Sequence, residues 1–145
     1  MLQGEYRHNI DDKGRLQIPA RFKEELGEEF VLCRGVARGN GRCLWAFTME
    51  GWESFTAKIG SMSFSDAQDF KRFFINKSEL CGKDNQGRML IPQFLRNHAG
   101  IEGKGVCVLA GSITHVEIWN EAEYDRAQDE LTNERMEERM SEFHF

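Results

Sequence analysis

The chain has 145 residues, 40% of them hydrophobic and 30% charged, a length that suits one compact domain or two small, intimate halves rather than a multidomain enzyme. Its first residues lack the basic and apolar stretches of a signal peptide, and no apolar run approaches the ~20 residues needed to cross a bilayer. We therefore expect a cytoplasmic protein without a membrane partner.

The formal net charge of −5 is unevenly distributed along the chain. Residues 1–120 carry 16 Lys and Arg against 15 Asp and Glu, whereas residues 121–145 carry 3 against 9. The acidity therefore belongs to the C-terminal segment, and the rest of the chain can still present a local basic face. The acidic composition counts against a nucleic-acid partner without excluding one.

The first well-defined element in chain order is a tight turn followed by a strand, in the run DDKGRLQIP at residues 11–19. The Asp11 carboxylate can accept hydrogen bonds from its own turn, and Gly14 supplies a positive φ. Pro19 ends the strand and suits the start of a short helix. The alternation of the strand separates two pairs of side chains, with Leu16 and Ile18 on one face and Arg15 and Gln17 on the other.

An apolar run at residues 30–33 predicts a further strand, and the basic, glycine-rich segment 35–42 after it predicts a hairpin connection. That segment has none of the spacings of a phosphate-binding loop. Residues 50–59 and 66–75 then place apolar side chains at helical spacing, namely Trp52, Phe55, Ile59, Phe70, Phe73 and Phe74. We expect this stripe to be core, although its surplus could form a subunit interface.

The turn motif occurs a second time, 73 residues further along the chain. The run DNQGRMLIP at residues 84–92 matches the first run at its Asp, Gly, Arg, Ile and Pro. The segments that follow also correspond, and residues 47–53 resemble residues 119–125. We therefore predict an α+β, β-rich fold of two pseudo-repeated units, residues 5–49 and 78–121, joined by a helical linker at 50–77 and followed by an acidic helix or tail at 122–145.

The tail has good helix formers that continue from residue 121 to residue 140, with Glu and Arg at helical spacing. This pattern predicts one solvated acidic helix. A sharper hypothesis is that the tail repels DNA from the wrong face or tunes assembly.

The residues that could carry metal or covalent chemistry are scattered. The four cysteines form no C-x-x-C pair, and we expect them to be small buried apolar residues rather than disulfides or zinc ligands: Cys33, Cys43, Cys81 and Cys107. The four histidines are widely separated, and neither G-x-S-x-G nor H-E-x-x-H is present. We expect neither an enzyme nor a cofactor.

The spacing Asp-x-x-x-Arg places a carboxylate at the start of each turn and a guanidinium at its exit. If the two side chains pair, the planar Arg fork is held in one orientation, which suits contact with O6 and N7 of guanine or with a phosphate. A two-stranded ribbon also fits the major groove. For one copy, an Asp that caps its turn and a solvated Arg would be the simpler interpretation, but two matched copies favour a function.

Both motif runs resemble the MraZ family, which belongs to the AbrB-like swapped-hairpin superfamily. The resemblance includes GEY at residues 4–6, EIW at 117–119 and the aromatic linker helix around 70–74, and it covers residue 1 to about residue 125. It implies that two swapped-hairpin units interlock into one small β barrel flanked by helices. The loop at 35–42 is longer and more basic than the family pattern, and the tail is individual to this chain.

The resemblance further implies a DNA-binding transcription regulator, usually a repressor of the division and cell-wall gene cluster that includes its own gene. It would act as a ring-shaped homo-oligomer on short direct repeats in double-stranded promoter DNA. Carried over by position, the DNA-contacting candidates are Lys13, Arg15 and Arg88, with Asp11 and Asp84 as orienting partners and Gln86 and Arg21 as weaker candidates. An alternative hypothesis is a β-barrel protein-interaction or assembly module that does not bind DNA.

Overall fold

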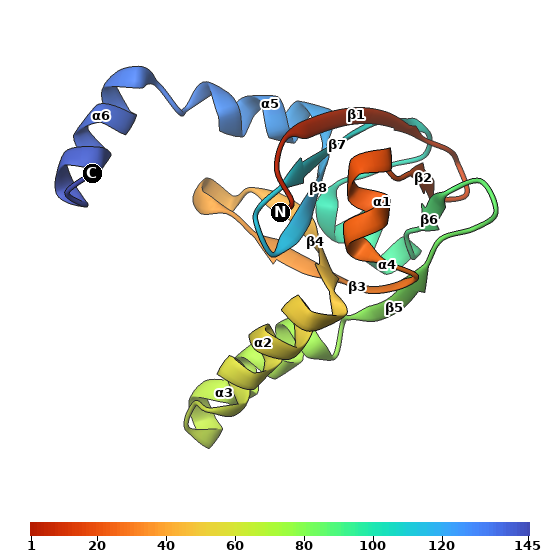
Figure 1. The fold of residues 1–145 in the computed structure, drawn as a ribbon, viewed down its shortest axis with the longest axis horizontal. Helices are drawn as coiled ribbons and strands as arrows, with labels where there is room; N and C mark the ends of the chain where they lie inside the picture. Colours follow the sequence, from red (N-terminus) through yellow and green to blue (C-terminus); the bar gives the residue numbers. More distant parts are fainter.

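The two repeats form a single eight-stranded antiparallel sheet that nearly closes into a barrel (Figure 1). The computed structural model describes residues 1–145. Its strands are β1 (Glu5–Ile10), β2 (Arg15–Gln17), β3 (Glu29–Val36), β4 (Arg42–Thr48), β5 (Glu79–Gly82), β6 (Arg88–Leu90), β7 (Gly105–Gly111) and β8 (His115–Asn120). Its helices are α1 (Ala20–Leu26), α2 (Met49–Gly60), α3 (Phe64–Phe70), α4 (Gln93–Ala99), α5 (Glu121–Asp129) and α6 (Asn133–Glu142), with a 3₁₀ turn at Arg38–Asn40 and a π-helical turn, η2, at Lys71–Ile75.

The strand order, β5-β3-β4-β8-β7-β1-β2-β6, results from an exchange of strands between the repeats. The first strand of each repeat pairs with the third strand of the other, because β1 pairs with β7 and β5 pairs with β3. The pairs β2–β6 and β4–β8 also join one repeat to the other. Neither repeat therefore has a complete sheet of its own, and the predicted interlocked, β-rich fold is confirmed.

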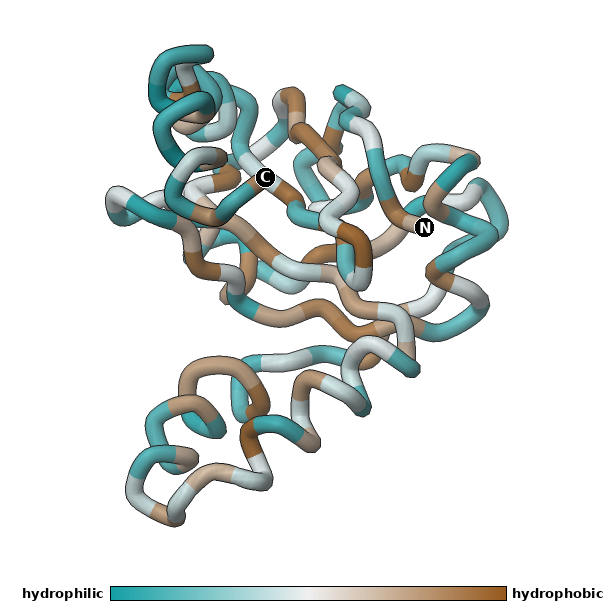
Figure 2. The backbone as a smooth tube through the Cα atoms, turned by 60° about the vertical axis from the view of Figure 1, so that its left-hand side comes forward, coloured by the Kyte–Doolittle hydropathy of each residue, from teal (hydrophilic) through white to brown (hydrophobic).

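The core lies inside the barrel and takes alternate residues from the strands, where the most hydrophobic stretches of the chain concentrate (Figure 2). The side chains predicted to face inward after each turn are at most 1% exposed: Leu16, Ile18, Met89 and Ile91. Burying one such side chain stabilises the fold by ~1.5–3 kcal/mol. A slip of one residue would turn all four outward, so this burial fixes the register of β2 and β6 and the residues on their outer face.

All four cysteines are free and buried. Burial raises the pKa of the Cys33, Cys43 and Cys107 thiols to about 12 and that of Cys81 to about 11. The prediction that they act as small apolar residues is confirmed, since thiols with such pKa values stay protonated near neutral pH.

Two helical arms leave the barrel, one after each repeat (Figures 1 and 2). In the first arm, α3 and η2 fold back along α2, which confirms the helices predicted at 50–59 and 66–75. The second arm is α5 followed by α6. The prediction of one continuous helix over 121–140 is wrong: α5 ends at Asp129, and α6 begins after Thr132, whose hydroxyl accepts a hydrogen bond from Arg135 N at 3.2 Å. None of the helices combines the length and the apolar character that crossing a membrane requires.

Candidate nucleic-acid interface

Each Asp-x-x-x-Arg segment forms the same turn between two short strands. In the first turn, Asp11 N donates to Arg15 O and Gly14 N donates to Asp11 O, both at 3.1 Å. The second turn repeats these bonds at 2.9 and 3.0 Å. The glycines have φ values of +87° at Gly14 and +75° at Gly87, a region that other residues rarely adopt. The predicted turns are therefore confirmed.

The Asp side chain organises both its turn and the Arg that follows. Asp11 Oδ1 accepts hydrogen bonds from the backbone amides of the second and fourth following residues, at 3.0 and 2.9 Å, and Asp84 Oδ1 does the same at 2.9 and 2.8 Å. The other carboxylate oxygen accepts from the guanidinium Nε, at 2.6 Å from Arg15 and 2.9 Å from Arg88. Each Arg is thus tethered through Nε, which leaves its Nη atoms available to a ligand.

Strand pairing places the two Arg residues on one outer face. In the β2–β6 ladder, Arg15 lies opposite Leu90 and Gln17 lies opposite Arg88. These four residues form the solvent-facing side of the two-stranded ribbon, since the intervening Leu16 is fully buried. Leu90 is 57% exposed, so the face combines two cationic forks with one apolar side chain.

The backbone also fastens the two turns to each other. The amide of Ile18 donates to Gly87 O at 3.1 Å, and the amide of Ile91 donates to Gly14 O at 2.8 Å. The side-chain amide of Gln17 donates to the carbonyls of Gly87 and of the residue before it, at 3.3 and 3.1 Å. The two forks therefore share one rigid support.

A hollow opens beside the forks, and it is predominantly basic. It is lined by His8, Asn9, Ile10, Asp11, Arg15, Gln17, Arg88, Lys104, Gly105 and Val106. Three cationic side chains face it against one carboxylate, Asp11, which is itself held by Arg15 and lies 3.9 Å from Arg88 Nη1. Pairing of Ile10 with Gly105 brings Lys104 to this place.

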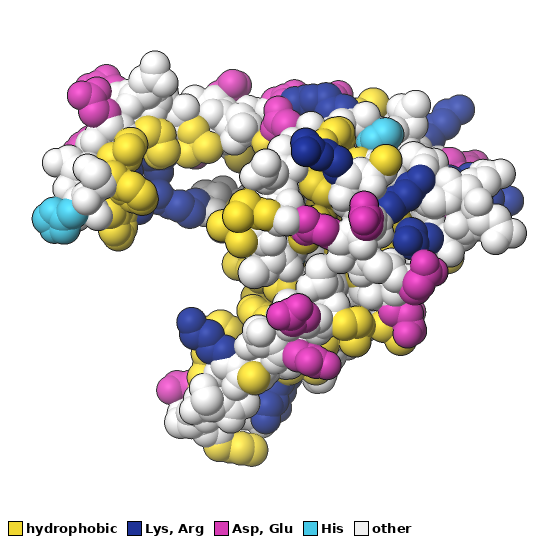
Figure 3. Space-filling model, in the orientation of Figure 1, with side chains coloured by type: hydrophobic (Ala, Val, Ile, Leu, Met, Phe, Trp, Pro, Cys, Tyr) yellow, Lys and Arg dark blue, Asp and Glu magenta, His cyan; other side chains and the backbone are white.

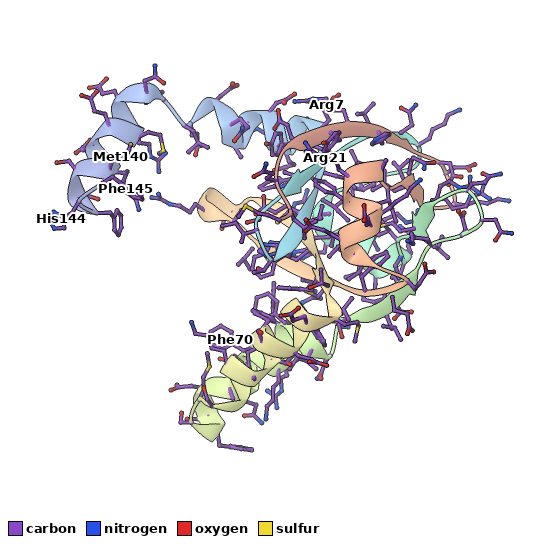
Figure 4. The ribbon with its side chains drawn as sticks, in the orientation of Figure 1. Arg7, Arg21, Phe70, Met140, His144 and Phe145 are labelled. Carbon is purple, nitrogen blue, oxygen red and sulfur yellow. The ribbon has the colours of Figure 1, made fainter.

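The structure brings most of the predicted site residues together. Arg15, Arg88 and Asp11 line the hollow, and the remaining members of the two turns are exposed around it: Lys13, Asp84 and Gln86. Arg21 does not join them, because it is exposed on α1, apart from both turns, and forms no hydrogen bond or ion pair with them (Figure 4). Sequence reasoning missed His8, which lies on β1 just before the first turn, and Lys104, which the β1–β7 pairing brings to the site.

The basic segment at residues 35–42 contains the β3–β4 hairpin connection, as predicted, and its ends belong to the two strands. It lies on the opposite side of the barrel from the two turns (Figure 1). One of its arginines, Arg42, approaches Glu123 of α5 at 4.0 Å. The arginines of this loop are therefore not part of the hollow between the forks.

The spatial distribution of charge is more favourable to an anionic ligand than the net charge of −5 suggests. Figure 3 shows acidic side chains along the α5–α6 arm, whereas on the side of the barrel that carries the turns Lys and Arg side chains lie among acidic ones. The most acidic segment, residues 121–145, is thus held away from the forks. Charges separated by more than a Debye length of ~8 Å are largely screened at physiological ionic strength.

A family model described as "MraZ protein, putative antitoxin-like" matches the chain twice, over residues 1–73 and 74–144, one match for each repeat. The chain belongs to the MraZ family. A "Transcriptional regulator MraZ" of Moorella thermoacetica is 42% identical over 147 residues, which cover 99% of each chain. Those of Ligilactobacillus salivarius and Thermoanaerobacter sp. are 42% and 47% identical over 132 and 122 residues, covering 90% and 83% of this chain and 88% and 81% of theirs.

The family that the motifs indicated is therefore confirmed. The expectation that the resemblance ends near residue 125 is wrong, because the second match extends to residue 144. MraZ-family relatives are named for the regulation of transcription, a class that is not enzymatic, so the expectations of a transcription regulator and of a protein that is not an enzyme are confirmed. The two family matches also coincide with the two structural copies of the turn.

The carboxylates of these MraZ-family turns are expected to titrate at unusually low pH. Hydrogen bonds, first of all from the backbone amides of Arg15 and Arg88, hold the pKa of Asp11 and Asp84 below the ordinary value of 3.8. Because the folded-state pKa is depressed, the stability these carboxylates contribute is present above the unfolded pKa and is lost as the pH falls through the folded pKa. Carboxyl NMR titration should give both midpoints below 3.8.

The same titration of Arg15→Ala provides the control. Asp11 should keep part of its shift in this variant, because the backbone donors remain when the guanidinium is removed. A midpoint at the ordinary value in the unmodified protein would contradict the turn geometry described above.

Proposed function

We propose that this chain regulates transcription by binding promoter DNA through its two Asp-oriented Arg forks. The observation that carries the proposal is the placement of Arg15 and Arg88 on one outer face of the paired β2–β6 ribbon, each tethered at Nε. The two Nη atoms of a guanidinium held this way match the O6 and N7 acceptors that guanine presents in the major groove. A two-stranded ribbon has the width that this groove admits.

The residues around the forks have distinct roles in this proposal. Arg15 and Arg88 read bases, while Asp11 and Asp84 fix the orientation of the forks without touching DNA. Lys13 at the tip of the first turn and Lys104 at the rim of the hollow contact phosphates, which position the protein without specifying sequence. Gln86 is the corresponding tip residue of the second turn and contacts the sugar-phosphate backbone of the DNA or a base edge.

The target consists of short direct repeats upstream of the division and cell-wall gene cluster, which includes the gene of the protein itself, and binding represses it. Several copies assembled in a ring-shaped homo-oligomer on the nucleoid would engage several repeats at once. Linked contacts raise the effective concentration of each further contact, so avidity offsets the modest charge of one chain. Repeats spaced by about one helical turn, ~10 bp, would present the same face of the duplex to neighbouring copies.

A fluorescence-anisotropy titration tests this proposal. A duplex from the upstream region of the gene and a scrambled duplex of equal length and composition are titrated at several salt concentrations. We expect tighter binding to the upstream duplex and an affinity for both that falls with salt, since phosphate contacts release counterions. Equal or absent binding to both duplexes would contradict the proposal and favour the alternative of a β-barrel protein-interaction module. A pull-down would then be used to identify its protein partner.

A further inference from the structure

Leu90 is an uncovered apolar side chain on the outer face of the β2–β6 ribbon. It is 57% exposed, whereas Met89 and Ile91 on either side of it are fully buried. The other three residues of that face are polar or charged: Arg15, Gln17 and Arg88. β6 is the last strand in the sheet order, and an exposed apolar side chain on such an edge favours unwanted association with other chains. A function on this face would account for the position of Leu90.

The register of the ribbon places Leu90 beside the first Arg fork. Arg15 lies directly opposite Leu90 in the ladder. Its backbone amide donates to Asp11 Oδ1 at 2.9 Å and its carbonyl accepts from Asp11 N at 3.1 Å, so neither group is directed at β6. Arg15 and Leu90 therefore form a non-hydrogen-bonded pair, the kind in which opposite side chains approach most closely. The Cβ atoms of directly opposite residues are ~4.5–5.5 Å apart.

The second fork has a different neighbour. Gln17 lies opposite Arg88 and is the counterpart of Leu90 in the other repeat, 73 residues earlier in the chain. Its side-chain amide is already occupied, because Nε2 donates to the carbonyls of Gln86 and Gly87 at 3.1 and 3.3 Å. Leu90 can form no such bonds. The two forks therefore have equivalent backbones but chemically different neighbours.

Thymine is the base whose chemistry matches an apolar neighbour. In the major groove its C5 methyl is the one alkyl group that the four bases present, beside the hydrogen-bond donors and acceptors that all of them carry. Successive bases of one strand are ~3.4 Å apart along the duplex. This spacing is close to the separation of opposite side chains in the ribbon, so Arg15 and Leu90 can reach neighbouring base pairs. Apolar contact with the methyl group then complements the two hydrogen bonds of the fork to guanine.

We propose that Leu90 is a specificity-determining residue, which contacts the C5 methyl of a thymine next to the guanine that Arg15 binds. Arg88 has Gln17 beside it in place of a leucine, so its guanine has no such thymine requirement. The two turns of one chain therefore read different base steps, and the pseudo-symmetric ribbon accepts its site in only one direction. The inference rests on the proposed function, because it specifies part of the base sequence that the forks read.

Replacement of single thymines by deoxyuracil tests this contact, because it removes the methyl group and leaves the pairing groups of the base unchanged. Each thymine in a duplex with one promoter repeat is replaced in turn, and the affinity of the full-length chain is measured by fluorescence anisotropy at one salt concentration. We expect about a fourfold loss of affinity at one thymine, the effect of losing one buried methyl group, and no loss at the others.

The guanine that Arg15 binds is located in the same duplex. It is the position at which 7-deazaguanine, which lacks the N7 acceptor, weakens binding of the unmodified chain but not of Arg15→Ala. We expect the sensitive thymine to lie in the base pair next to this guanine. A sensitive thymine next to the guanine that Arg88 binds would overturn the inference.

Substitutions of Leu90 show whether this side chain is the one that contacts the methyl group. Leu90→Ala should bind the thymine duplex about fourfold more weakly and make no distinction between thymine and deoxyuracil. Leu90→Met, which keeps an apolar side chain of similar volume, should restore the distinction. Leu131→Ala is the matched control, because Leu131 is 50% exposed between α5 and α6, on the arm held away from the turns (Figure 1). Circular dichroism and thermal unfolding show whether each variant remains folded.

The outcomes separate this inference from the proposed function. If the unmodified chain prefers promoter DNA but no thymine is sensitive to loss of its methyl group, the inference fails and the proposed function stands. If folded Leu90→Ala is as sensitive to deoxyuracil as the unmodified chain, another side chain reads the methyl group and the inference fails again. If the unmodified chain shows no preference for the promoter over the scrambled duplex, the proposed function fails and the inference falls with it.

Discussion

Replacing Arg15 and Arg88 together by Ala is expected to abolish the preference for promoter DNA while leaving the fold intact. Each bidentate contact to guanine contributes ~1–3 kcal/mol, so removing one guanidinium should weaken binding roughly 5- to 150-fold. Both side chains are outside the core, at 37% and 25% exposed, so the barrel should keep its stability. Anisotropy titration of the upstream and scrambled duplexes at one salt concentration measures the decrease in affinity.

Two further variants show whether the orientation of the guanidinium groups or their charge is responsible for the preference for promoter DNA. Arg126→Ala removes one positive charge on α5, where Arg126 pairs with Glu123 at 3.3 Å, and should leave DNA affinity nearly unchanged. The double variant Arg15→Lys, Arg88→Lys keeps the charge without the planar fork, so it should bind scrambled DNA normally and lose the preference for the promoter. Promoter preference that survives in the double Ala variant would show that other residues read the bases.

The largest expected loss of stability comes from Gly14→Ala, at about 2–4 kcal/mol of unfolding free energy. Gly14 has a φ of +87°, and a Cβ there would lie 2.7 Å from Ile91 O and 2.7 Å from Nε of the buried Arg96. Neither atom can move away cheaply, because Ile91 N donates to Gly14 O at 2.8 Å and Arg96 Nε donates to Ile91 O at 2.9 Å. Urea unfolding followed by circular dichroism gives the change.

Gly39→Ala is the matched control for the backbone conformation alone. Gly39 also has a positive φ, +67°, but nothing lies within 4 Å of the position of its Cβ. Its substitution should lower the unfolding free energy by about 1 kcal/mol, because Ala disfavours the left-handed backbone conformation. Equal losses of unfolding free energy in Gly14→Ala and Gly39→Ala would mean that the two turns can separate at little cost. That result would contradict the tight hydrogen bonding between the turns.

The local parts of the candidate site could be predicted from the sequence. Asp11, Gly14 and Arg15 lie within five residues of one another, so turn chemistry alone determines their hydrogen bonds. The alternation of Leu16 and Ile18 with polar neighbours also settled which face of β2 turns inward. The second copy of the motif established the family resemblance. That resemblance in turn predicted that the two repeats interlock into one barrel.

The non-local parts could not be predicted in this way. Lys104 reaches the hollow because β7 pairs with β1, and a single sequence carries no signal for that register. Arg21 and Arg15 are close in sequence, yet α1 directs Arg21 away from the turns. The break before α6 was also missed, although Thr132 and Asn133 are weaker helix formers than their neighbours and Thr132 caps the new helix.

The exchange of strands between the repeats has a consequence for synthesis of the chain. β1 ends at Ile10, but its main partner β7 begins only at Gly105. At a ribosomal rate of ~5–20 residues per second, the first strand emerges ~5–20 s before its partner. Throughout that interval most backbone groups of β1 lack their native partners, because only Ile10 pairs within the first repeat, and such exposed edges invite association with other chains. Nascent chains are therefore most vulnerable to aggregation before the second repeat emerges.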